Sequence, residues 1–163
     1  MIDLSRFEVW FVPGAQLLYG EGILGKVAEH AREMVNALSS APGMPVKIVR
    51  QPVMVTAESI LELCLEANRS RNCIGIITWM HTFSPAQMWI PGLLALQKPL
   101  AHLHTQFNRD LPWSKIDMDF MNLNQSAHGD REFGFIGSRL RINRKVIAGF
   151  WQDQDVQYQL TTW

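Results

Sequence analysis

The sequence predicts an α/β fold in which one parallel sheet lies between two layers of helices. Residues 73–80 form an apolar run without charge, rich in β-branched side chains, which is typical of a strand buried on both faces. Strand-like and helix-like segments alternate along the chain, which indicates parallel strands joined by right-handed crossovers. A chain of 163 residues can bury a substantial core, so we expect a single domain over 1–163.

The first half of the chain supplies three strands and two helices. Apolar residues recur at helical spacing from Leu24 to Leu38. Thr56 has the side chain of an N-cap and stands where the second helix should begin. The elements are, in order, a strand at 8–12, a helix over 24–38, an alternating and therefore edge-like strand at 46–49, a helix after Thr56, and the central strand at 73–80.

The second half continues the alternation and completes the predicted architecture. The elements are a helix at 85–96 that Pro91 should kink or interrupt, a strand at 99–105, a polar and aromatic stretch at 106–124, a helix at 125–141, a strand at 145–150, and a last helix capped by Asp153. We expect a three-layer αβα sandwich of the flavodoxin or Rossmann-like kind, with a five-stranded parallel sheet of order 2-1-3-4-5. Ligands of such sheets bind beyond the carboxyl ends of the strands.

Composition narrows the kind of protein. Fifteen basic and fifteen acidic residues cancel, so nothing indicates a nucleic-acid or acidic-membrane partner. The sequence has neither a signal peptide nor an apolar run that could span a bilayer, so we expect a cytoplasmic protein. Cys64 and Cys73 form no disulfide framework or zinc motif and should be core residues. Trp163 ends a helix-like segment without a cap, which suggests that the natural chain extends further.

Two patterns suggest chemistry and are weighed against simpler interpretations. Residues 20–25 spell GxGxxG, but several residues separate them from the first strand, whereas a dinucleotide site needs the glycines directly after it. His102 and His104 lie on one face of a strand and could bind a metal with Asp117 or Asp119. Hydrogen bonding to backbone or water is the commoner role of such histidines, and we favour it.

The helix at 125–141 is unusual because it contains several glycines. Gln125, His128 and Glu132 fall on one helical face. Each glycine inside a helix lowers stability by about 0.5–1 kcal/mol relative to alanine, so another backbone or a ligand is expected to come close. A tightly packed helix with a solvated polar face is the simpler interpretation. The glycines are Gly129, Gly134 and Gly137.

Several motifs resemble the N-terminal domain of L-arabinose isomerase. They are residues 79–86 (WMHTFSPA), 103–108 (LHTQFN) and 116–137, together with the opening strand at 8–12 and the loop at 16–20. The resemblance covers essentially the whole chain. It implies aldose–ketose isomerisation of L-arabinose to L-ribulose, and of D-galactose to D-tagatose, by metal-assisted enediol chemistry with Mn²⁺.

The resemblance also implies which residues act. The catalytic glutamates and the metal ligands of the family belong to later domains, so we expect no catalytic or metal-binding residue here and no cofactor in this chain. Gln16, Leu18, Tyr19 and Phe83 match positions that line the sugar pocket. Gln125 and His128 match a segment that reaches the pocket of a neighbouring subunit in the family's hexamer, and such a subunit contact would explain the glycine-dense helix.

Four positions depart from the family's usual residues. Ala15 and Leu17 stand where serine and histidine are common, in the sugar-binding loop. Gln87 replaces a common lysine and Phe150 a common histidine, and both look like surface or packing variation. Because the catalytic and metal-binding residues are missing, we expect a domain that is inactive alone. The departures at Ala15 and Leu17 motivate the alternative, a stand-alone sugar-binding or self-associating module, and a nucleotide binder is a weaker alternative. Apolar surface left uncovered around Trp163 and the glycine-dense helix would favour self-association.

Overall fold

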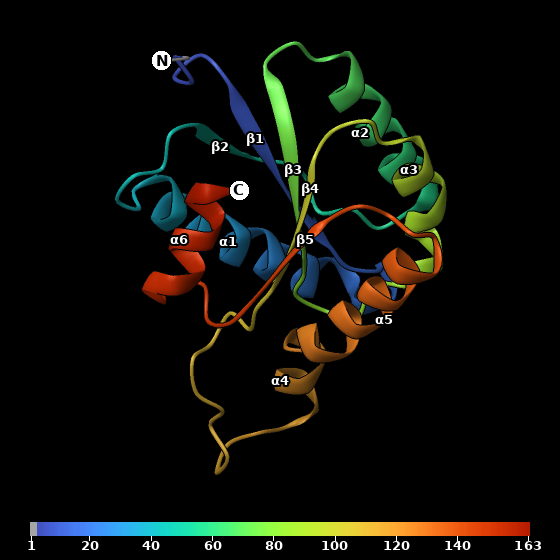
Figure 1. Cartoon of the computed structure of the whole chain (residues 1–163). Helices are drawn as coiled ribbons and strands as arrows, with labels where there is room; N and C mark the ends of the chain where they lie inside the picture. The colour runs from blue at the N-terminus through green and yellow to red at the C-terminus, as the bar shows by residue number, and fades with distance from the viewer. Residues whose placement is uncertain (1–2) are drawn as a thin grey trace.

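A five-stranded parallel sheet forms the middle layer of the computed structural model, which describes residues 3–163 (Figure 1). The strands are β1 (Glu8–Gly14), β2 (Lys47–Arg50), β3 (Cys73–Met80), β4 (Leu100–His104) and β5 (Lys145–Ala148). Their order, β2-β1-β3-β4-β5, and their parallel pairing confirm the predicted fold class and the edge position of β2. The predicted domain limits also include Met1 and Ile2, which lie outside the described residues.

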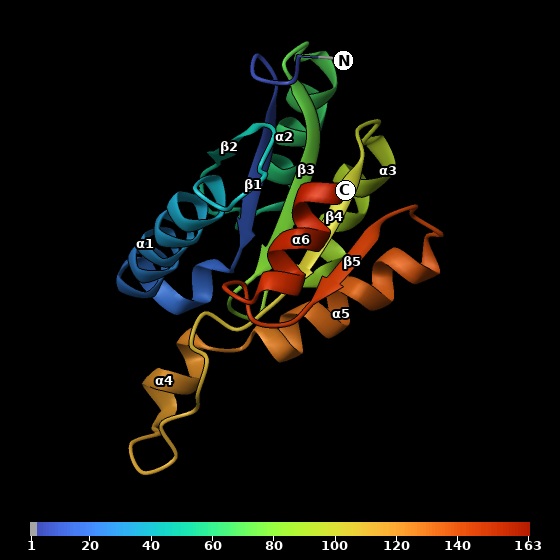
Figure 2. The ribbon, with the colours of Figure 1, turned by 60° about the vertical axis from the view of Figure 1, so that its left-hand side comes forward.

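Helices cover both faces of the sheet, as Figures 1 and 2 show. One face carries α1 (Gly20–Ser39) and α6 (Gln154–Thr162), and the other carries α2 (Ala57–Arg69), α3 (Ile90–Ala95) and α5 (Ser126–Arg139). Two short 3-10 helices, η1 (Leu17–Tyr19) and η2 (Ala86–Trp89), follow β1 and precede α3. None of the helices described in residues 3–163 is both long and apolar enough to cross a membrane.

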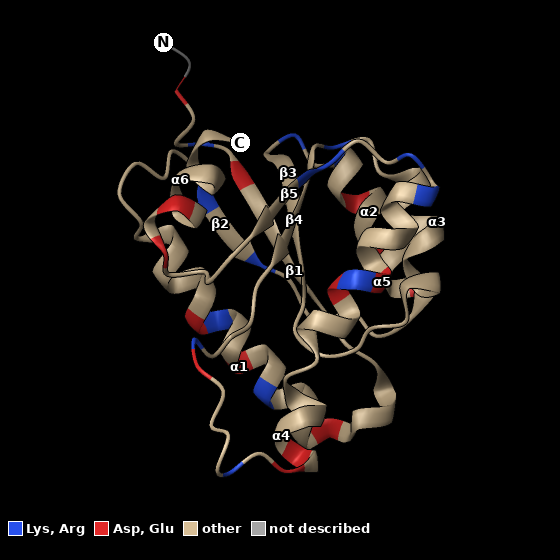
Figure 3. Cartoon of the chain, turned by 60° about the horizontal axis from the view of Figure 1, so that its bottom comes forward, with Lys and Arg blue, Asp and Glu red and all other residues tan. Residues whose placement is uncertain are grey.

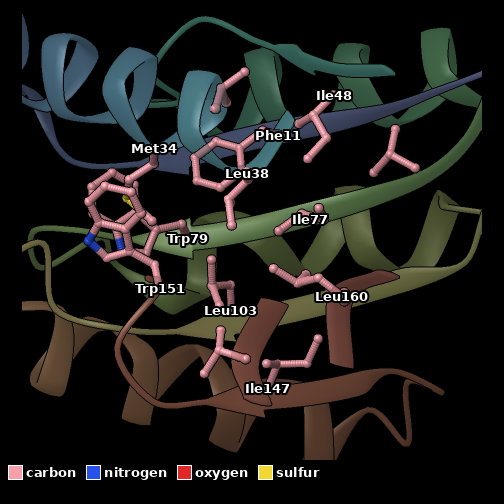
Figure 4. Packing of buried hydrophobic residues seen from close by; sticks show 14 of the residues in the cluster. Phe11, Met34, Leu38, Ile48, Ile77, Trp79, Leu103, Ile147, Trp151 and Leu160 are labelled. Atoms are coloured by element: carbon pink, nitrogen blue, oxygen red, sulfur yellow. The ribbon is translucent and has the colours of Figure 1, made fainter. Parts of the chain in front are cut away.

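Successive residues of β1 enter opposite halves of the core, which explains why the strands lack polar alternation. Phe11 joins the cluster under α1 and α6, which Figure 4 shows together with Ile77, Leu103 and Trp151. Val12 joins the cluster under α2, α3 and α5. Each large side chain that is fully buried in these clusters contributes about 1.5–3 kcal/mol. The free cysteines Cys64 and Cys73 are buried, as predicted, and burial raises the pKa of the Cys64 thiol to about 12.

Several element ends differ from the sequence-based prediction. Helix α1 begins at Gly20, earlier than its apolar face suggested, because the first turns are exposed. Strand β1 continues through Pro13 and Gly14, and the Pro13 carbonyl accepts a hydrogen bond from Met54 N–H (2.8 Å). The last strand ends before Gly149, whose φ of 143° few other residues adopt.

The predicted interruption at Pro91 is confirmed, since the segment divides into η2 and α3 with this proline in the first turn of α3. Thr56 caps α2 as predicted, because its Oγ1 accepts a hydrogen bond from Ser59 N–H (3.2 Å). Asp153 stands at the predicted N-cap position of α6, where its backbone carbonyl accepts from Gln157 N–H (3.0 Å), but its side chain does not cap the helix. The carboxylate pairs instead with the Arg109 guanidinium.

Residues 106–124 form an arm that projects from the carboxyl edge of the sheet (Figures 1 and 2). The sequence did not predict its one helix, α4 (Met118–Leu123), which Asp117 caps by accepting from Phe120 N–H (2.8 Å). Trp151 Nε1–H donates to the Phe107 carbonyl (3.0 Å) and holds the base of the arm. Figure 3 marks acidic positions on the ribbon at α4, where Asp117 and Asp119 lie, while both signs of charge are spread over the rest of the chain.

Candidate functional site

The predicted site residues gather at the carboxyl edge of the sheet, around the ends of β1 and β3. The connection from β1 runs to β2 on one side and the chain after β3 continues to β4 on the other, so this is the switch point where open α/β sheets bind ligands. Gln16, Leu18 and Tyr19 follow β1, and Phe83 follows β3. Gln125 and His128 stand at the start of α5.

Two contacts join these segments across the edge. The Tyr19 hydroxyl donates to Gln125 Oε1 (3.3 Å). The rings of Phe83 and His128 lie 4.8 Å apart, centroid to centroid, at an interplanar angle of 35°. Leu18 is 84% exposed and the His128 side chain 62% exposed, so this surface is open to a ligand. Tyr19, Phe83, Gln125 and His128 therefore lie together on a single chain, and the reach of Gln125 and His128 into a neighbouring subunit's pocket stays a prediction.

The glycines of α5 let the helix lie directly against its own chain. A Cβ at Gly129 would lie 2.6 Å from the Thr82 carbonyl oxygen, so the first turn of α5 touches the backbone that follows β3. A Cβ at Gly137 would lie within 2.8 Å of the Arg144 guanidinium. The predicted close approach is confirmed, but both neighbours are intramolecular, so a subunit contact is not needed to explain these glycines.

Trp163 also packs within the chain. It is half-buried against the cluster under α1 and α6, and its ring lies 2.7 Å from where a Cβ at Gly75 would stand. The indole itself is therefore partly covered, because a glycine in β3 makes room for it, while an apolar cavity remains beside it.

His102 and His104 share one face of β4, as predicted, with their rings parallel to within 1°. Their acidic neighbour is Asp130 on α5, while Asp117 and Asp119 lie on or beside α4 in the arm. His102 Nε2 lies 2.6 Å from Asp130 Oδ1, and His104 Nε2 lies 3.8 Å from Asp130 Oδ2. Within residues 3–163, no group of three or more histidine, cysteine or acidic side chains could hold a metal ion.

Burial dominates the electrostatics of this pair. It raises the pKa of the Asp130 carboxyl well above its usual range and lowers the pKa of His102 to about 4, with the Arg144 charge adding to the second effect. The distance of 2.6 Å between His102 Nε2 and Asp130 Oδ1 means that one proton lies between these two atoms in a hydrogen bond. Because His102 Nδ1 is buried without a partner, the tautomer protonated at Nε2 avoids a stranded N–H.

A second histidine pair, formed by His30 on α1 and His81 directly after β3, was not predicted from the sequence. His30 Nδ1 and His81 Nε2 are 2.7 Å apart, so one ring donates to the other. His81 stacks on Trp79 and His30 on Phe107, at centroid distances of 4.5 and 3.7 Å. Burial, together with the neighbouring His30, lowers the pKa of His81 to about 3. This stack ties α1 to the base of the arm.

A sequence signal existed for both missed acid–base groups. Asp130 lies on the inward face of α5 with Phe133 and Gly137, and His30 lies on the inward face of α1 with Val27 and Met34. A titratable residue on an apolar helical face needs a buried partner. The sequence could not supply the partner, because it comes from another element.

The remaining sequence-based hypotheses can be placed on the structure. The GxGxxG glycines lie inside α1, and Gly22 and Gly25 are exposed, so they form no phosphate-binding turn after β1. Ala15 is fully buried, whereas Leu17 is 61% exposed beside Leu18. Phe150 packs under the Arg109 guanidinium, 4.3 Å from its ring centroid, which fits the predicted packing role.

The fold and this edge define an α/β domain with a composite surface, partly polar and partly aromatic, at the switch point of its sheet. Such surfaces belong to domains that bind small ligands beyond the strand ends. The chain belongs to the L-arabinose isomerase N-terminal domain family, whose model matches residues 3–163, and this confirms the resemblance seen in the sequence.

Curated relatives are similar to the chain over its full length. L-arabinose isomerases from Koribacter versatilis (strain Ellin345), Flavobacterium johnsoniae and Herpetosiphon aurantiacus are 66%, 62% and 58% identical to it over 163 residues. The matches cover 100% of this chain but only 33%, 32% and 32% of these relatives. The chain thus spans about a third of the length of the relatives it matches.

Proposed function

We propose that this chain is the substrate-pocket and subunit-contact domain of an L-arabinose isomerase. It would serve the conversion of L-arabinose to L-ribulose, and of D-galactose to D-tagatose, in the cytoplasm. The observation that carries the proposal is the match of the whole chain to enzymes of this name, combined with the gathering of the predicted pocket residues at the switch point.

The surface has the chemistry that a sugar requires. The Gln16 and Gln125 amides, the Tyr19 hydroxyl and the His128 imidazole can exchange hydrogen bonds with sugar hydroxyls. Phe83 and Leu18 can pack against the apolar C–H faces of the ring. We assign these residues to binding and orientation of the sugar.

Mn²⁺, which the resemblance implies for the complete enzyme, would supply a Lewis acid for the sugar oxygens. His102, His104 and Asp130 are poorly suited to hold this metal ion. His102 and Asp130 are buried and bonded to each other, and His104 faces the same carboxyl group. We therefore assign the metal and the catalytic glutamates to the part of the enzyme beyond this chain, and we propose that the chain alone is inactive.

Ketose formation by this chain with L-arabinose and Mn²⁺, over a range of protein concentrations, tests the proposal. We expect no product above a blank. Product that persists after full-length contaminants are removed would overturn the assignment of catalysis to other domains. His102, His104 and Asp130 would then be the first residues to replace.

The departures at Ala15 and Leu17 favour one alternative, a stand-alone sugar-binding or self-associating module. Calorimetry with L-arabinose, D-galactose and their ketoses separates the two functions. Heat of binding at low millimolar sugar, without turnover, would support the module. Absence of heat at low millimolar sugar would argue against the module and favour the enzyme domain, which we expect to bind sugar only weakly, at high millimolar concentration, when it is alone.

A further inference from the structure

The first turn of α5 is fixed to the sheet by a buried acid that the proposed function does not use. The Asp130 side chain has no exposed surface, and it reaches across to His102 on β4, with His104 Nε2 3.8 Å from its other oxygen. A buried acid is costly to desolvate, and an apolar side chain of similar size would usually be at least as stable there. An acid can, however, form a short and directional hydrogen bond, which an apolar side chain cannot.

That bond lies close to the proposed pocket residues. Asp130 is two residues from His128 and five from Gln125, all at the start of α5. Gly129, between His128 and Asp130, rests on the Thr82 carbonyl, one residue before Phe83. The Gly129 contact sets how close the first turn lies to this backbone, and Ser126 Oγ, which donates to Gln106 Oε1 (2.6 Å), holds the start of the helix. The Asp130–His102 bond adds a directional contact with β4.

We propose that Asp130 is a positioning residue for the sugar surface. Its bond to His102 sets the rotation of the first turn of α5, so that His128 lies against Phe83 and Gln125 meets Tyr19. The proposal rests on the proposed function where it concerns sugar. Its geometric part concerns only the residues of this chain.

NMR spectroscopy of the whole chain tests the geometric part without any sugar. The Phe83–His128 contact should give a nuclear Overhauser effect and a ring-current shift of His128, and the shared proton of His102 should resonate at low field. Asp130→Leu should abolish all three signals while thermal unfolding remains cooperative. Asp130→Asn keeps an acceptor and should retain the His128 signals. Asp155→Asn, an exposed change on α6, is the matched control.

A second pair of variants serves if Asp130→Leu does not fold. Gln at 102 can place a donor near the position of Nε2, so His102→Gln should keep the Phe83–His128 signals. His102→Leu should lose them. Rescue by Gln but not Leu indicates that the bond, rather than the filled volume, positions His128. Unchanged His128 signals in every folded leucine variant would overturn the proposal.

A titration with L-arabinose connects this result to the sugar. The leucine variants should bind at least ~10-fold more weakly than the Asn and Gln variants, since misplacement of a binding group by about 1 Å can have effects of this size or larger. If the parent chain shows the Phe83–His128 signals but no sugar-dependent change, the assignment to sugar fails while the geometric part stands. If the leucine variants bind sugar as well as the parent, the positioning role fails.

Discussion

At the scale of the residue, glycines that look alike in the sequence have opposite consequences in the structure. Gly129 faces the Thr82 carbonyl oxygen at a distance that no Cβ tolerates, whereas a methyl group at Gly25 on α1 would meet nothing within 4 Å. We therefore expect Gly129→Ala to destabilise the fold by about 1–3 kcal/mol through overpacking. Gly25→Ala should stabilise it by about 0.5–1 kcal/mol. Urea unfolding of both variants measures the difference.

The two substitutions are controls for each other because both add one methyl group inside a helix. Equal effects on the free energy of unfolding would mean that the close approach of α5 to the end of β3 is incorrect. The Phe83–His128 contact would then lose its structural basis.

The buried His81 makes the fold sensitive to acid. The folded pKa of His81 is about 3 and the usual value is 6.5, so below pH 6.5 the unfolded chain binds a proton that the folded chain refuses. Stability is complete above pH 6.5 and falls by about 1.4 kcal/mol per pH unit as the pH decreases towards 3. Burial also lowers the pKa of His30, although the nearby carboxylates of Glu33 and Glu29 partly offset this effect. The lowered pKa of His30 therefore also reduces the stability of the fold in acid.

Unfolding in urea at about pH 7 and about pH 4.5 measures this dependence. His81→Phe preserves an aromatic ring on Trp79 but cannot titrate, so its stability should depend less steeply on pH over the same interval. The lowered pKa of His102 and the raised pKa of Asp130 act on stability in opposite directions over this interval. A parent chain equally stable at both pH values would contradict the buried neutral state of His81.

At the scale of the element, two residues that were both predicted to cap helices have different roles in the structure. Thr56 caps α2 through its hydroxyl, whereas the Asp153 carboxylate at α6 is paired with Arg109. Thr56→Ala should lower the free energy of unfolding by about 1 kcal/mol. Asp153→Ala removes only an exposed ion pair, which is worth about 0–1 kcal/mol and less in high salt. Thermal unfolding at low and high salt separates the two effects.

Local signals were sufficient to predict most elements of this fold. The apolar run at 73–80 marked the buried central strand, and the alternation of strands and helices led to the correct strand order. Helix α4 escaped prediction because it is short and has no buried residue, so it carries no apolar periodicity. The sequence could not show that the Asp153 side chain pairs with Arg109 and does not cap α6, because Arg109 lies 44 residues away.

The candidate site could be predicted only in part, for the same reason. The resemblance and the rule for strand ends indicated which residues follow β1 and β3. Two contacts of this site join residues that are far apart in the sequence, 106 positions for Tyr19–Gln125 and 28 positions for His102–Asp130. A local sequence pattern cannot predict contacts over such separations. Long-range hydrogen bonds depend on how α5 lies on the sheet, which only the folded chain defines.

At the scale of the whole molecule, the arm at 106–124 gathers several large exposed apolar side chains in one segment. Leu111, Trp113, Met118 and Met121 are all exposed, and Trp113 is 79% exposed. We expect this surface to drive association between copies of the chain. Sedimentation should show a mass that rises with concentration. Combined Trp113→Ser and Met118→Ser substitutions should weaken association by about tenfold or more.

Tyr158→Ser is the matched control for the arm, because Tyr158 is a similarly exposed large side chain on α6. It should leave association unchanged. A parent chain that stays monomeric at every concentration would contradict this use of the arm.

The most direct test of the proposed sugar-binding surface is to locate the residues of this domain that respond to L-arabinose. Backbone amide shifts of the whole chain, followed during titration with L-arabinose to high millimolar concentration, report that place residue by residue. We expect shifts at residues 16–19, at Phe83 and at 125–128, around the ends of β1 and β3. Shifts confined to the apolar cavity beside Trp163, or no shifts at all, would contradict it.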